Sequence, residues 1–381
     1  MATTSDVLVV GGGVIGLSCA WRAARRGMSV CVLERDRVAA GASGVAAGML
    51  APVSEASWGE DDLLALSLAS HRIWPAFAEE LAADSGQEPG HRVNGALHLA
   101  LDRDEAEELR RRHDQHQRLE LPSRWLRPRE CRELEPGLAP SVAGGLLVED
   151  EASIDPGSLC VALATAIESA GGRIEVGAEV MDADLDGSVA RLTATDGRRF
   201  EAASVVLAAG CWSGVAEWLD PAARPPVRPV KGEILTLRGP ADDPVCSRMV
   251  VTERVYLVPR ADGRLIAGAT VQERGFDTMV TAGGTLELLR EAYRALPDTA
   301  ELELVEASAG LRPGTPDNLP LIGPGLSGNL VIATGHFRNG VLQAPVTAES
   351  VVSLLAGTEP PIDLEPFSPS RFATEPEAAL R

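Results

Sequence analysis

The sequence predicts an α/β fold in which a βαβ-built unit is joined to a second unit made of antiparallel strands. Two observations predict the first unit: the apolar run 6–10 leads directly into three glycines, and the amphipathic segment 14–26 follows them. A third predicts the second unit, because the strand-like runs 255–259 and 264–270 are joined by Ala261-Asp262-Gly263, a hairpin signal. The length of 381 residues is sufficient for two such units.

The first unit opens with one βαβ arrangement. Residues 6–10 (DVLVV) are mostly apolar, as expected for a strand buried in a parallel sheet. The helix 14–26 follows and ends at Gly27, and residues 29–33 (SVCVL) form a second strand that ends at Glu34. This span of about 30 residues is the usual size of a βαβ unit.

Periodicity and capping signals predict the later elements. Asp155 before Pro156 is typical of a helix start, so a helix is expected at 156–170. Other helices are expected at 61–84 with a bend at Pro75, at 104–118, at 283–295, and after the glycine-rich turn that follows residue 334, up to about 356. Strands are expected at 173–178, 189–195, 204–209, 227–237 and 329–334. The Pro-, Glu- and Ser-rich tail 357–381 is expected to be a poorly ordered or wrapping arm.

The charge balance argues against several classes of partner. The chain carries 35 Lys and Arg against 55 Asp and Glu, a formal net charge of −20. Nucleic acids and anionic membranes attract basic patches, so we expect neither as a partner. We find no apolar stretch of about 18 residues that would form a transmembrane helix, and no secretory signal pattern before residues 6–10.

Cysteines and histidines indicate the compartment and the use of metals. The six cysteines form no C-x-x-C pair, so we expect buried, reduced thiols in a cytoplasmic protein. His113 and His116 lie in an Arg-rich helical segment without a nearby third ligand, and no metal site is predicted.

The glycines before the first helix form a nucleotide-binding pattern. Gly11, Gly13 and Gly16 follow a strand and open a helix, and Glu34 ends the next strand. The first glycine makes the tight turn, the second lets backbone approach a pyrophosphate, and the third allows close helix–strand packing. Glu34 can accept hydrogen bonds from ribose hydroxyls but is poorly suited to a 2′-phosphate, which argues against NADP. The adjacent Arg35 means that NADP is still an alternative. This segment alone does not distinguish NAD from FAD.

Motifs along most of the chain carry a more specific resemblance. They are VLVVGGGVIGL (7–17), AAGML (46–50), VVLAAGCWS (205–213), PVKGE (229–233), VYLVPR (255–260), AGAT (267–270), AGLRPGTPDNLPLIG (309–323) and ATGHFRNGV (333–341). With these motifs the chain resembles the D-amino acid oxidase superfamily of flavoproteins, and most closely the glycine oxidases of thiamine biosynthesis. The last two motifs are the most specific.

The resemblance implies non-covalent FAD and a division into domains. The fold class is then a Rossmann-like FAD-binding domain with a discontinuous α+β substrate domain built on an antiparallel sheet. The FAD-binding domain is expected at 1–83, 150–222 and 306–356, the substrate domain at 84–149 and 223–305, and the tail at 357–381.

The resemblance also implies the residues that hold the cofactor. Gly11, Gly13, Val14, Ile15 and Gly16 belong to the pyrophosphate turn, and Glu34 and Arg35 to the adenosine. Along the phosphates the resemblance implies Ala42 and Ser43, and along the isoalloxazine ring Ala47, Gly48 and Met49. Near the adenine it implies Val180, and at a strand end beside the cofactor Ala209 and Gly210. The residues expected to run past the pyrimidine edge of the flavin are His336, Phe337, Arg338, Asn339, Gly340, Val341 and Leu342. This last turn precedes a helix, whose N-terminus favours negative charge.

Four residues are candidates for the substrate site. Arg312, between an apolar run and a Pro-Gly turn, is suited to a bidentate pair with a carboxylate, with a structural ion pair as the alternative. The resemblance places the hydroxyl of Tyr256 on the same carboxylate; the alternative is a core tyrosine. Arg338 is expected to support the flavin edge or the product carbonyl, or else to form a salt bridge under its turn. Arg254 is expected near the pocket or in solvent.

The chain departs from the family pattern at positions that bear on the substrate. In the best-known glycine oxidases a histidine stands at the position of Arg254 and a methionine at that of Val271, and Gln343 is a further polar insertion near the flavin. Residues 309–345 contain no cysteine, so the covalent flavin attachment of the sarcosine-oxidase-like relatives is not expected there. The single lysine, Lys231, lies on a different segment from their oxygen-activating lysine and is expected to be structural.

The resemblance implies oxidative deamination of glycine, and of sarcosine or small D-amino acids, by hydride transfer to flavin N5. The products are an imino acid, then a 2-oxo acid and ammonia, with hydrogen peroxide formed from molecular oxygen, for the thiazole branch of thiamine biosynthesis. Alternatives are a D-amino acid or secondary-amine oxidase, a dehydrogenase with another electron acceptor, a flavin-binding protein without catalysis, and a simple NAD-binding module. Family members commonly form homo-oligomers.

Overall fold

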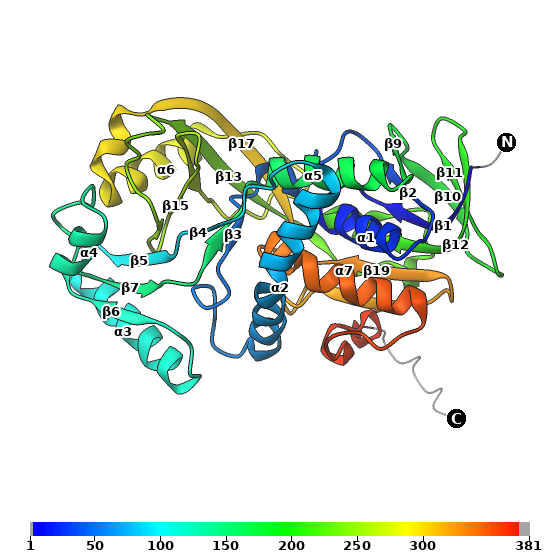
Figure 1. The fold of residues 1–381 in the computed structure, drawn as a ribbon, viewed down its shortest axis with the longest axis horizontal. Coiled ribbons are helices and arrows are strands. Elements are labelled where there is room, and N and C mark those ends of the chain that lie inside the picture. The colour runs from blue at the N-terminus through cyan, green and yellow to red at the C-terminus, as the bar shows by residue number, and fades with distance from the viewer. Residues whose placement is uncertain (1–2, 373–381) are drawn as a thin grey trace.

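A computed structural model of the chain describes residues 3–372 and shows two units side by side (Figure 1). The helices are α1 (Val14–Arg25), α2 (Asp61–Ser85), α3 (Arg103–Arg118), α4 (Pro128–Leu134), α5 (Pro156–Ser169), α6 (Ala282–Ala295) and α7 (Gly340–Ala356). Short 3₁₀ turns add η1 (Ala42–Val45), η2 (Gly210–Val215), η3 (Pro221–Ala223), η4 (Pro297–Glu301), η5 (Glu365–Phe367) and η6 (Pro369–Phe372).

The first unit is built on one mainly parallel sheet. Its strand order is β10-β11-β12-β1-β2-β9, and β19 joins β12 with β18 beside it. The strands are β1 (Thr3–Val10), β2 (Val30–Glu34), β9 (Arg173–Val176), β10 (Val180–Asp184), β11 (Ala190–Ala194), β12 (Arg199–Leu207), β18 (Leu321–Pro324) and β19 (Leu330–Thr334). β1 runs parallel to β2 and β12, and β12 to β19, so the carboxyl ends of these strands meet at one edge.

Helices α1, α2, α5 and α7 pack together against one face of this sheet (Figure 1). Their contact is a continuous apolar core in which the side chains of Leu17, Trp21, Trp74 and Phe77 are fully buried. The other face is covered by the segment from Cys211 to Val227, in which apolar side chains pack on β1, β2 and β12. The central strands β1, β2, β12 and β19 are therefore covered on both faces, which explains their apolar runs, whereas the outer strands β9 and β10 are polar and largely exposed.

The second unit is built on an antiparallel sheet with the order β17-β13-β16-β15-β14-β5-β7-β6, in which only β14 and β5 pair in parallel. These strands are β5 (Ala96–Ala100), β6 (Arg124–Leu126), β7 (Gly144–Val148), β13 (Arg228–Arg238), β14 (Met249–Val251), β15 (Tyr256–Pro259), β16 (Arg264–Gly268) and β17 (Glu303–Gly314). A small sheet of β3 (Met49–Leu50), β8 (Ala152–Ser153) and β4 (Arg92–Val93) completes the strands.

The predicted fold class is confirmed, and the predicted helices and strands are present with ends shifted by a few residues. The hairpin at Ala261-Asp262-Gly263 joins β15 to β16 as expected. The long strand β17 was not predicted, although it pairs with β13 along almost its whole length. Its sequence mixes acidic residues, glycines and Pro313, so neither periodicity nor propensity identifies it.

The first part of the tail wraps back onto the first unit. Phe367 is buried in the core beneath α7, and Arg371 pairs with Asp317 at 2.8 Å and donates to the backbone carbonyl of Leu319. Of the two alternatives expected for the tail, a poorly ordered or a wrapping arm, the wrapping arm is present from residue 357 to residue 372. The remainder of that prediction, residues 373–381, lies outside the described residues.

Candidate active site

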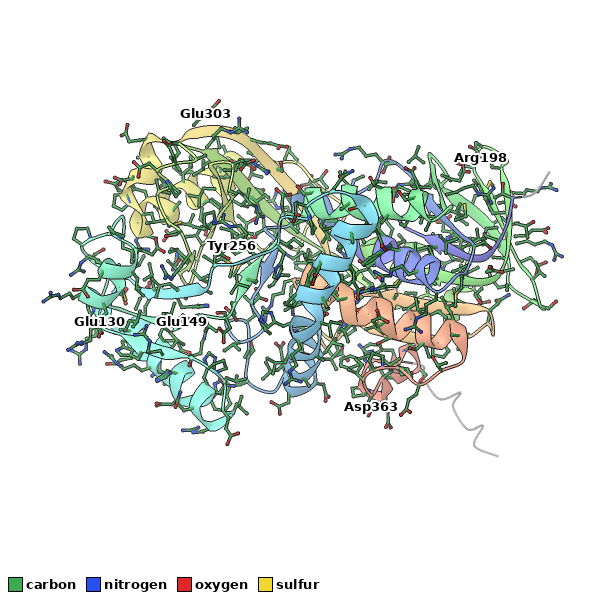
Figure 2. The ribbon with its side chains drawn as sticks, in the orientation of Figure 1. Glu130, Glu149, Arg198, Tyr256, Glu303 and Asp363 are labelled. Carbon is green, nitrogen blue, oxygen red and sulfur yellow. The ribbon has the colours of Figure 1, made fainter. Side chains whose placement is uncertain are left out.

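A cavity of about 1120 Å³ extends from the carboxyl ends of β1, β2 and β12 to the inner face of the antiparallel sheet. Its lining begins at Val10, Glu34 and Ala208, where these strands end, and continues to Tyr256 and Arg312 in the second unit. Tyr256 lies in the second unit, on its side toward the first unit (Figure 2). Clefts at the carboxyl edge of a parallel sheet are where such folds bind ligands.

The three glycines have the geometry that the nucleotide-binding pattern requires. Gly11 has φ +114°, and a Cβ there would overlap the carbonyl of Ala208. A Cβ at Gly16 would overlap the carbonyl of Gly11, so this residue brings α1 close to β1 and does not line the cavity. Gly13 lines the cavity as the N-cap of α1.

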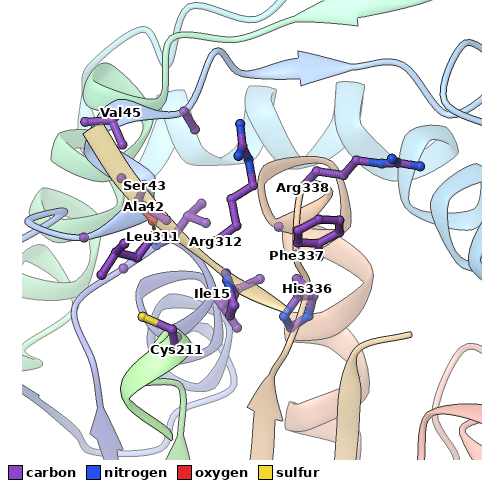
Figure 3. Close-up of a pocket in the computed structure, with 18 of the residues that line it drawn as sticks. Ile15, Ala42, Ser43, Val45, Cys211, Leu311, Arg312, His336, Phe337 and Arg338 are labelled. Carbon is purple, nitrogen blue, oxygen red and sulfur yellow. Dashed lines mark hydrogen bonds between the residues drawn. The ribbon is translucent and has the colours of Figure 1, made fainter. Parts of the chain in front are cut away.

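The N-terminus of α1 faces the cavity together with the η1 turn. Ser43 Oγ accepts a hydrogen bond of 2.9 Å from the backbone N–H of Val14, and Ile15 and Ala42 line the same wall (Figure 3). Backbone N–H groups and a hydroxyl converge there at a helix N-terminus, a donor set suited to a pyrophosphate.

The adenosine end of the cavity is organised around Glu34. Its carboxylate accepts hydrogen bonds from the backbone N–H groups of Gly12 and Asp36, at 2.7 and 2.8 Å, which hold it at the end of β2. Arg35 stacks on the ring of Trp212, 4.6 Å from its centroid. Val180, Ala209 and Gly210 complete this end of the lining.

Ala47, Gly48 and Met49 line the middle of the cavity, and their backbone is held from both units. The carbonyl of Gly48 accepts a 2.8 Å hydrogen bond from the N–H of Ile154. The buried guanidinium of Arg260, at the end of β15, donates to the carbonyl of Ala47. Burial lowers the pKa of Arg260 to about 10, so it remains charged at neutral pH.

The turn before α7 also borders the cavity, and Figure 3 shows its residues His336, Phe337 and Arg338 to the right of Arg312. The ring of His336 is buried, and its Nε2 lies 2.9 Å from the hydroxyl of Thr347. Burial lowers the pKa of His336 to about 3, so the ring is neutral. Gly340 and Val341 line the cavity at the first turn of α7, whereas Asn339 and Leu342 do not.

Side chains of α2 form hydrogen bonds with the backbone of α7 close to Pro345. The carbonyl of Leu342 accepts hydrogen bonds from Trp74 Nε1 at 2.8 Å and from Ser70 Oγ at 2.7 Å. Gln343 is fully buried, and its Nε2 donates to Ser67 Oγ at 3.1 Å. The polar insertion at Gln343 therefore contacts α2, and it is not part of the cavity lining.

Arg312 and Tyr256 approach each other across the antiparallel sheet. Arg312 lies on β17, and its Nη1 donates to the carbonyl of Thr270 at 3.1 Å. Its guanidinium lies over Gly232 of β13, where any Cβ would overlap it. The ring of Tyr256 lies over Gly268 of β16 in the same way. Burial raises the pKa of Tyr256, so the hydroxyl stays protonated and can donate.

The two other predicted arginines lie at the edge of the cavity. Arg338 Nε is 3.1 Å from Glu55 Oε2, and its Nη2 is 3.6 Å from Glu60 Oε2, so the salt bridge that was the alternative for this residue is present, and its role at the flavin edge stays a prediction. Arg254 is exposed and lines the rim.

Several lining residues were not predicted from the sequence. Glu55, His98 and Arg112 add polar side chains to the lining, and Gly232 and Gly268 make room for the side chains of Arg312 and Tyr256. The glycines stand inside the quoted motifs PVKGE and AGAT, so a search for small residues facing a buried guanidinium or ring would have found them. Glu55 follows AAGML closely, but nothing in its local pattern sets it apart from the other carboxylates.

Lys231 is buried on the far side of the sheet from the cavity lining. Its Nζ lies 3.2 Å from Glu233 Oε1 and 3.7 Å from Asp277, and it donates to the carbonyl of Met279. This network ties the segment 271–281 to β13. Within residues 3–372, no cluster of His, Cys, Asp and Glu is arranged to hold a metal ion, and no helix is long and apolar enough to cross a membrane.

Comparisons with known proteins bear on the whole chain. The model of a family described as FAD dependent oxidoreductase matches residues 6–354. The chain is 37% identical to a glycine oxidase of Geobacillus kaustophilus, over 96% of this chain and 97% of that protein. It is 37% identical to the bifunctional protein ThiO/ThiG of Synechocystis sp., over 98% of this chain but only 55% of that protein.

The fold is also similar to that of a solved structure over nearly the whole length of both chains. The crystal structure of glycine oxidase from Geobacillus kaustophilus has a TM-score of 0.90 and 36% sequence identity, covering 97% of this chain and 99% of that one. The glycine turn, the donors at the start of α1 and the small-residue segment Ala47–Met49 fit an FAD molecule, and all three line one cavity. The chain therefore belongs to the FAD dependent oxidoreductase family.

Proposed function

We propose that this chain is an FAD-dependent amino acid oxidase whose substrate is glycine, with the imine product serving the thiazole branch of thiamine biosynthesis. The observation that carries the proposal is the pairing of Arg312 with Tyr256 in the cavity that fits FAD. The relatives named glycine oxidase and ThiO/ThiG support the substrate and the pathway. The alternative of another D-amino acid or a secondary amine has weaker support.

In this proposal Arg312 and Tyr256 bind the substrate carboxylate. The guanidinium of Arg312 presents parallel N–H donors, and the protonated hydroxyl of Tyr256 adds a third donor. Because both side chains lie over glycines of a continuous sheet, the carboxylate position is fixed before the substrate arrives. Fixing the carboxylate orients the α-carbon toward the Ala47–Met49 wall.

FAD held in this cavity would supply the two-electron redox chemistry, as the acceptor of the α-hydrogen and its electron pair, with molecular oxygen as the proposed final electron acceptor. The residues proposed to hold it are the predicted set around Gly11, Glu34, Ser43, Ala47 and the turn before α7. The first turn of α7 favours negative charge at the flavin edge. The neutral ring of His336 donates or accepts a hydrogen bond with Thr347 and adds no competing charge.

Three further statements belong to the proposal. The six free cysteines are buried, which supports a cytoplasmic location. The strands of the first sheet come from residues 3–34, 173–207 and 321–334, which supports the discontinuous domain division. A homo-oligomer rests on the family resemblance alone and is tested by light scattering of the purified protein.

A peroxide assay across glycine, sarcosine, D-alanine, D-proline and larger D-amino acids tests the proposed function. We expect yellow protein that releases FAD in acid and turns over glycine with the highest kcat/KM. A parallel assay with an artificial electron acceptor under argon separates an oxidase from a dehydrogenase. Protein that cannot be reconstituted with FAD, or that ignores every amine in the panel, would contradict the proposal.

A further inference from the structure

One acidic side chain lies near Arg312 and Tyr256, the two residues that form the proposed carboxylate clamp. Among the carboxylates that line the cavity, Glu34, Asp36, Glu179 and Glu217 lie toward the adenosine end and Glu253 is exposed at the rim. Glu55 lies instead near the clamp, where its negative charge helps to raise the pKa of Tyr256. The positive charge of Arg312 in turn acts to lower the pKa of the carboxyl group of Glu55.

Glu55 is only partly satisfied by the protein. Its Oε2 is 3.1 Å from Nε of Arg338, yet the two are not aligned as a hydrogen bond. Among the described residues this buried oxygen has no hydrogen-bond partner. A buried carboxylate oxygen without a donor is costly unless a ligand supplies the donor. The groups that face it are Arg112 on α3, Arg312 on β17, Tyr256 on β15, Arg338 before α7, Glu60 before α2 and Glu151 before β8.

An amino acid carries a positive ammonium group on the carbon next to its carboxylate. A site that recognises both groups therefore needs a negative charge close to its carboxylate clamp. We propose that Glu55 binds the substrate ammonium group while Arg312 and Tyr256 hold the carboxylate, and that Glu55 accepts a proton from that ammonium group. This inference rests on the proposed function, because it assumes an amino acid substrate.

The proton step balances without any further reactant. One N–H bond of the ammonium group breaks, its electron pair stays on nitrogen, and an O–H bond forms on Glu55. The α C–H bond can then break with its electron pair leaving toward the bound FAD, while the nitrogen lone pair forms the C=N bond. Burial raises the pKa of Glu55, which makes this carboxylate a better proton acceptor than an exposed one.

Calorimetric titration of the anaerobically reduced holoenzyme tests the recognition step without turnover. Glycine and glycolate share a carboxylate and a size, but only glycine carries an ammonium group. We expect Glu55→Gln to weaken glycine binding about tenfold to a hundredfold, as for a lost charge-assisted hydrogen bond. Glycolate binding should change by less than about threefold, since its hydroxyl does not need the negative charge.

Glu60→Gln is the matched control, because it removes the same charge from the same arginine. Glu60 lies 3.6 Å from Arg338, and it is not part of the cavity lining. We expect this variant to bind both ligands as the wild type does. Equal weakening of glycine and glycolate in Glu55→Gln would show a structural role for the pair with Arg338 and overturn the proposal, as would unchanged glycine binding.

The pH dependence of kcat/KM tests the proton step. In the wild type the acid limb reports the protonation of Glu55, since a protonated carboxyl group cannot accept a second proton. In Glu55→Gln we expect that limb to move to higher pH, because glycine must then arrive with a neutral amine. An identical limb in both proteins excludes Glu55 as the acceptor. A wild type that neither binds nor oxidises glycine would instead refute the proposed function itself.

Discussion

At the scale of single residues, the carboxylate clamp depends on what its neighbours lack. Arg312 and Tyr256 each lie over a glycine of an adjacent strand, Gly232 and Gly268. In a sheet, a side chain at either position would fill the space now used by the guanidinium or by the ring. The two glycines therefore belong to the candidate site as much as the residues that make the hydrogen bonds.

Replacing Arg312 by Ala removes the main cation for the substrate carboxylate. We expect kcat/KM for glycine to fall by about a hundredfold or more, mostly through KM, with FAD still bound. Steady-state peroxide assays measure the kinetic effect, and the visible flavin spectrum reports the cofactor. An unchanged KM would refute the clamp.

Replacing Gly232 by Ala tests the space rather than the charge. The new Cβ overlaps the guanidinium of Arg312, so we expect a loss of glycine turnover of about the size seen for Arg312→Ala. Gly283→Ala is the control, because a Cβ at that position meets no atom within 4 Å. Equal activity of the two alanine variants would show that Arg312 can move without cost.

Glu151 gives a pH dependence of stability that belongs to one residue. Burial raises its pKa from 4.5 to about 8, although it accepts hydrogen bonds from the N–H groups of Val53 and Ser54. Since the folded state holds this proton more tightly than the unfolded state, stability falls as pH rises from about 4.5 to about 8.

Glu151→Gln keeps an acceptor for both N–H groups but does not titrate. We expect its free energy of unfolding, measured by urea titration at several pH values, to fall less steeply over that pH range than that of the wild type. Parallel pH profiles of the two proteins would contradict this assignment.

At the scale of elements, the segment 271–281 is held to β13 by buried charge. Lys231 and Glu233 are both fully buried, and Lys231 also reaches Asp277 and the carbonyl of Met279. A buried ion pair contributes little compared with apolar packing, but removing one partner leaves an uncompensated charge. The pair therefore fixes this segment beside the cavity.

Lys231→Met leaves Glu233 buried without its cation. We expect a loss of about 3–5 kcal/mol in the free energy of unfolding, measured by urea titration. The double variant Lys231→Met, Glu233→Gln should recover a large part of that loss. The exposed pair Arg129–Glu133 serves as the control, since Arg129→Ala should cost less than about 1 kcal/mol. Similar losses for both pairs would contradict the assigned role.

The elements also show where sequence reasoning succeeds and where it stops. The glycine turn, α1 and the turn before α7 were predictable because local chemistry determines them: a helix start, a tight turn and a short backbone approach. Strand β17 and the pairing of β5 with β7 were not, because each depends on a partner strand several tens of positions away in the sequence. Glu55 escaped prediction for the same reason, because only the fold brings it to Arg312.

At the scale of the whole molecule, the two units share one cavity, so a ligand that spans it joins them. FAD bound there would contact segments from the start, middle and end of the chain. We expect FAD to raise the melting temperature of protein from which the cofactor has been removed. At a free FAD concentration a hundredfold above Kd, binding adds about 2.7 kcal/mol to the free energy of unfolding. Differential scanning fluorimetry with and without FAD measures this, and AMP alone should give a smaller shift.

The strand order of the first sheet has a consequence for how the protein is made. β1 leaves the ribosome first, but one of its two neighbours, β12, begins only at Arg199. At about 5–20 residues per second, one edge of this apolar strand waits roughly ten to forty seconds for its partner. A length series of nascent chains, assayed for binding to a chaperone, should therefore show strong binding until β12 has emerged. Synthesis itself is thus the period in which this protein is most exposed to aggregation.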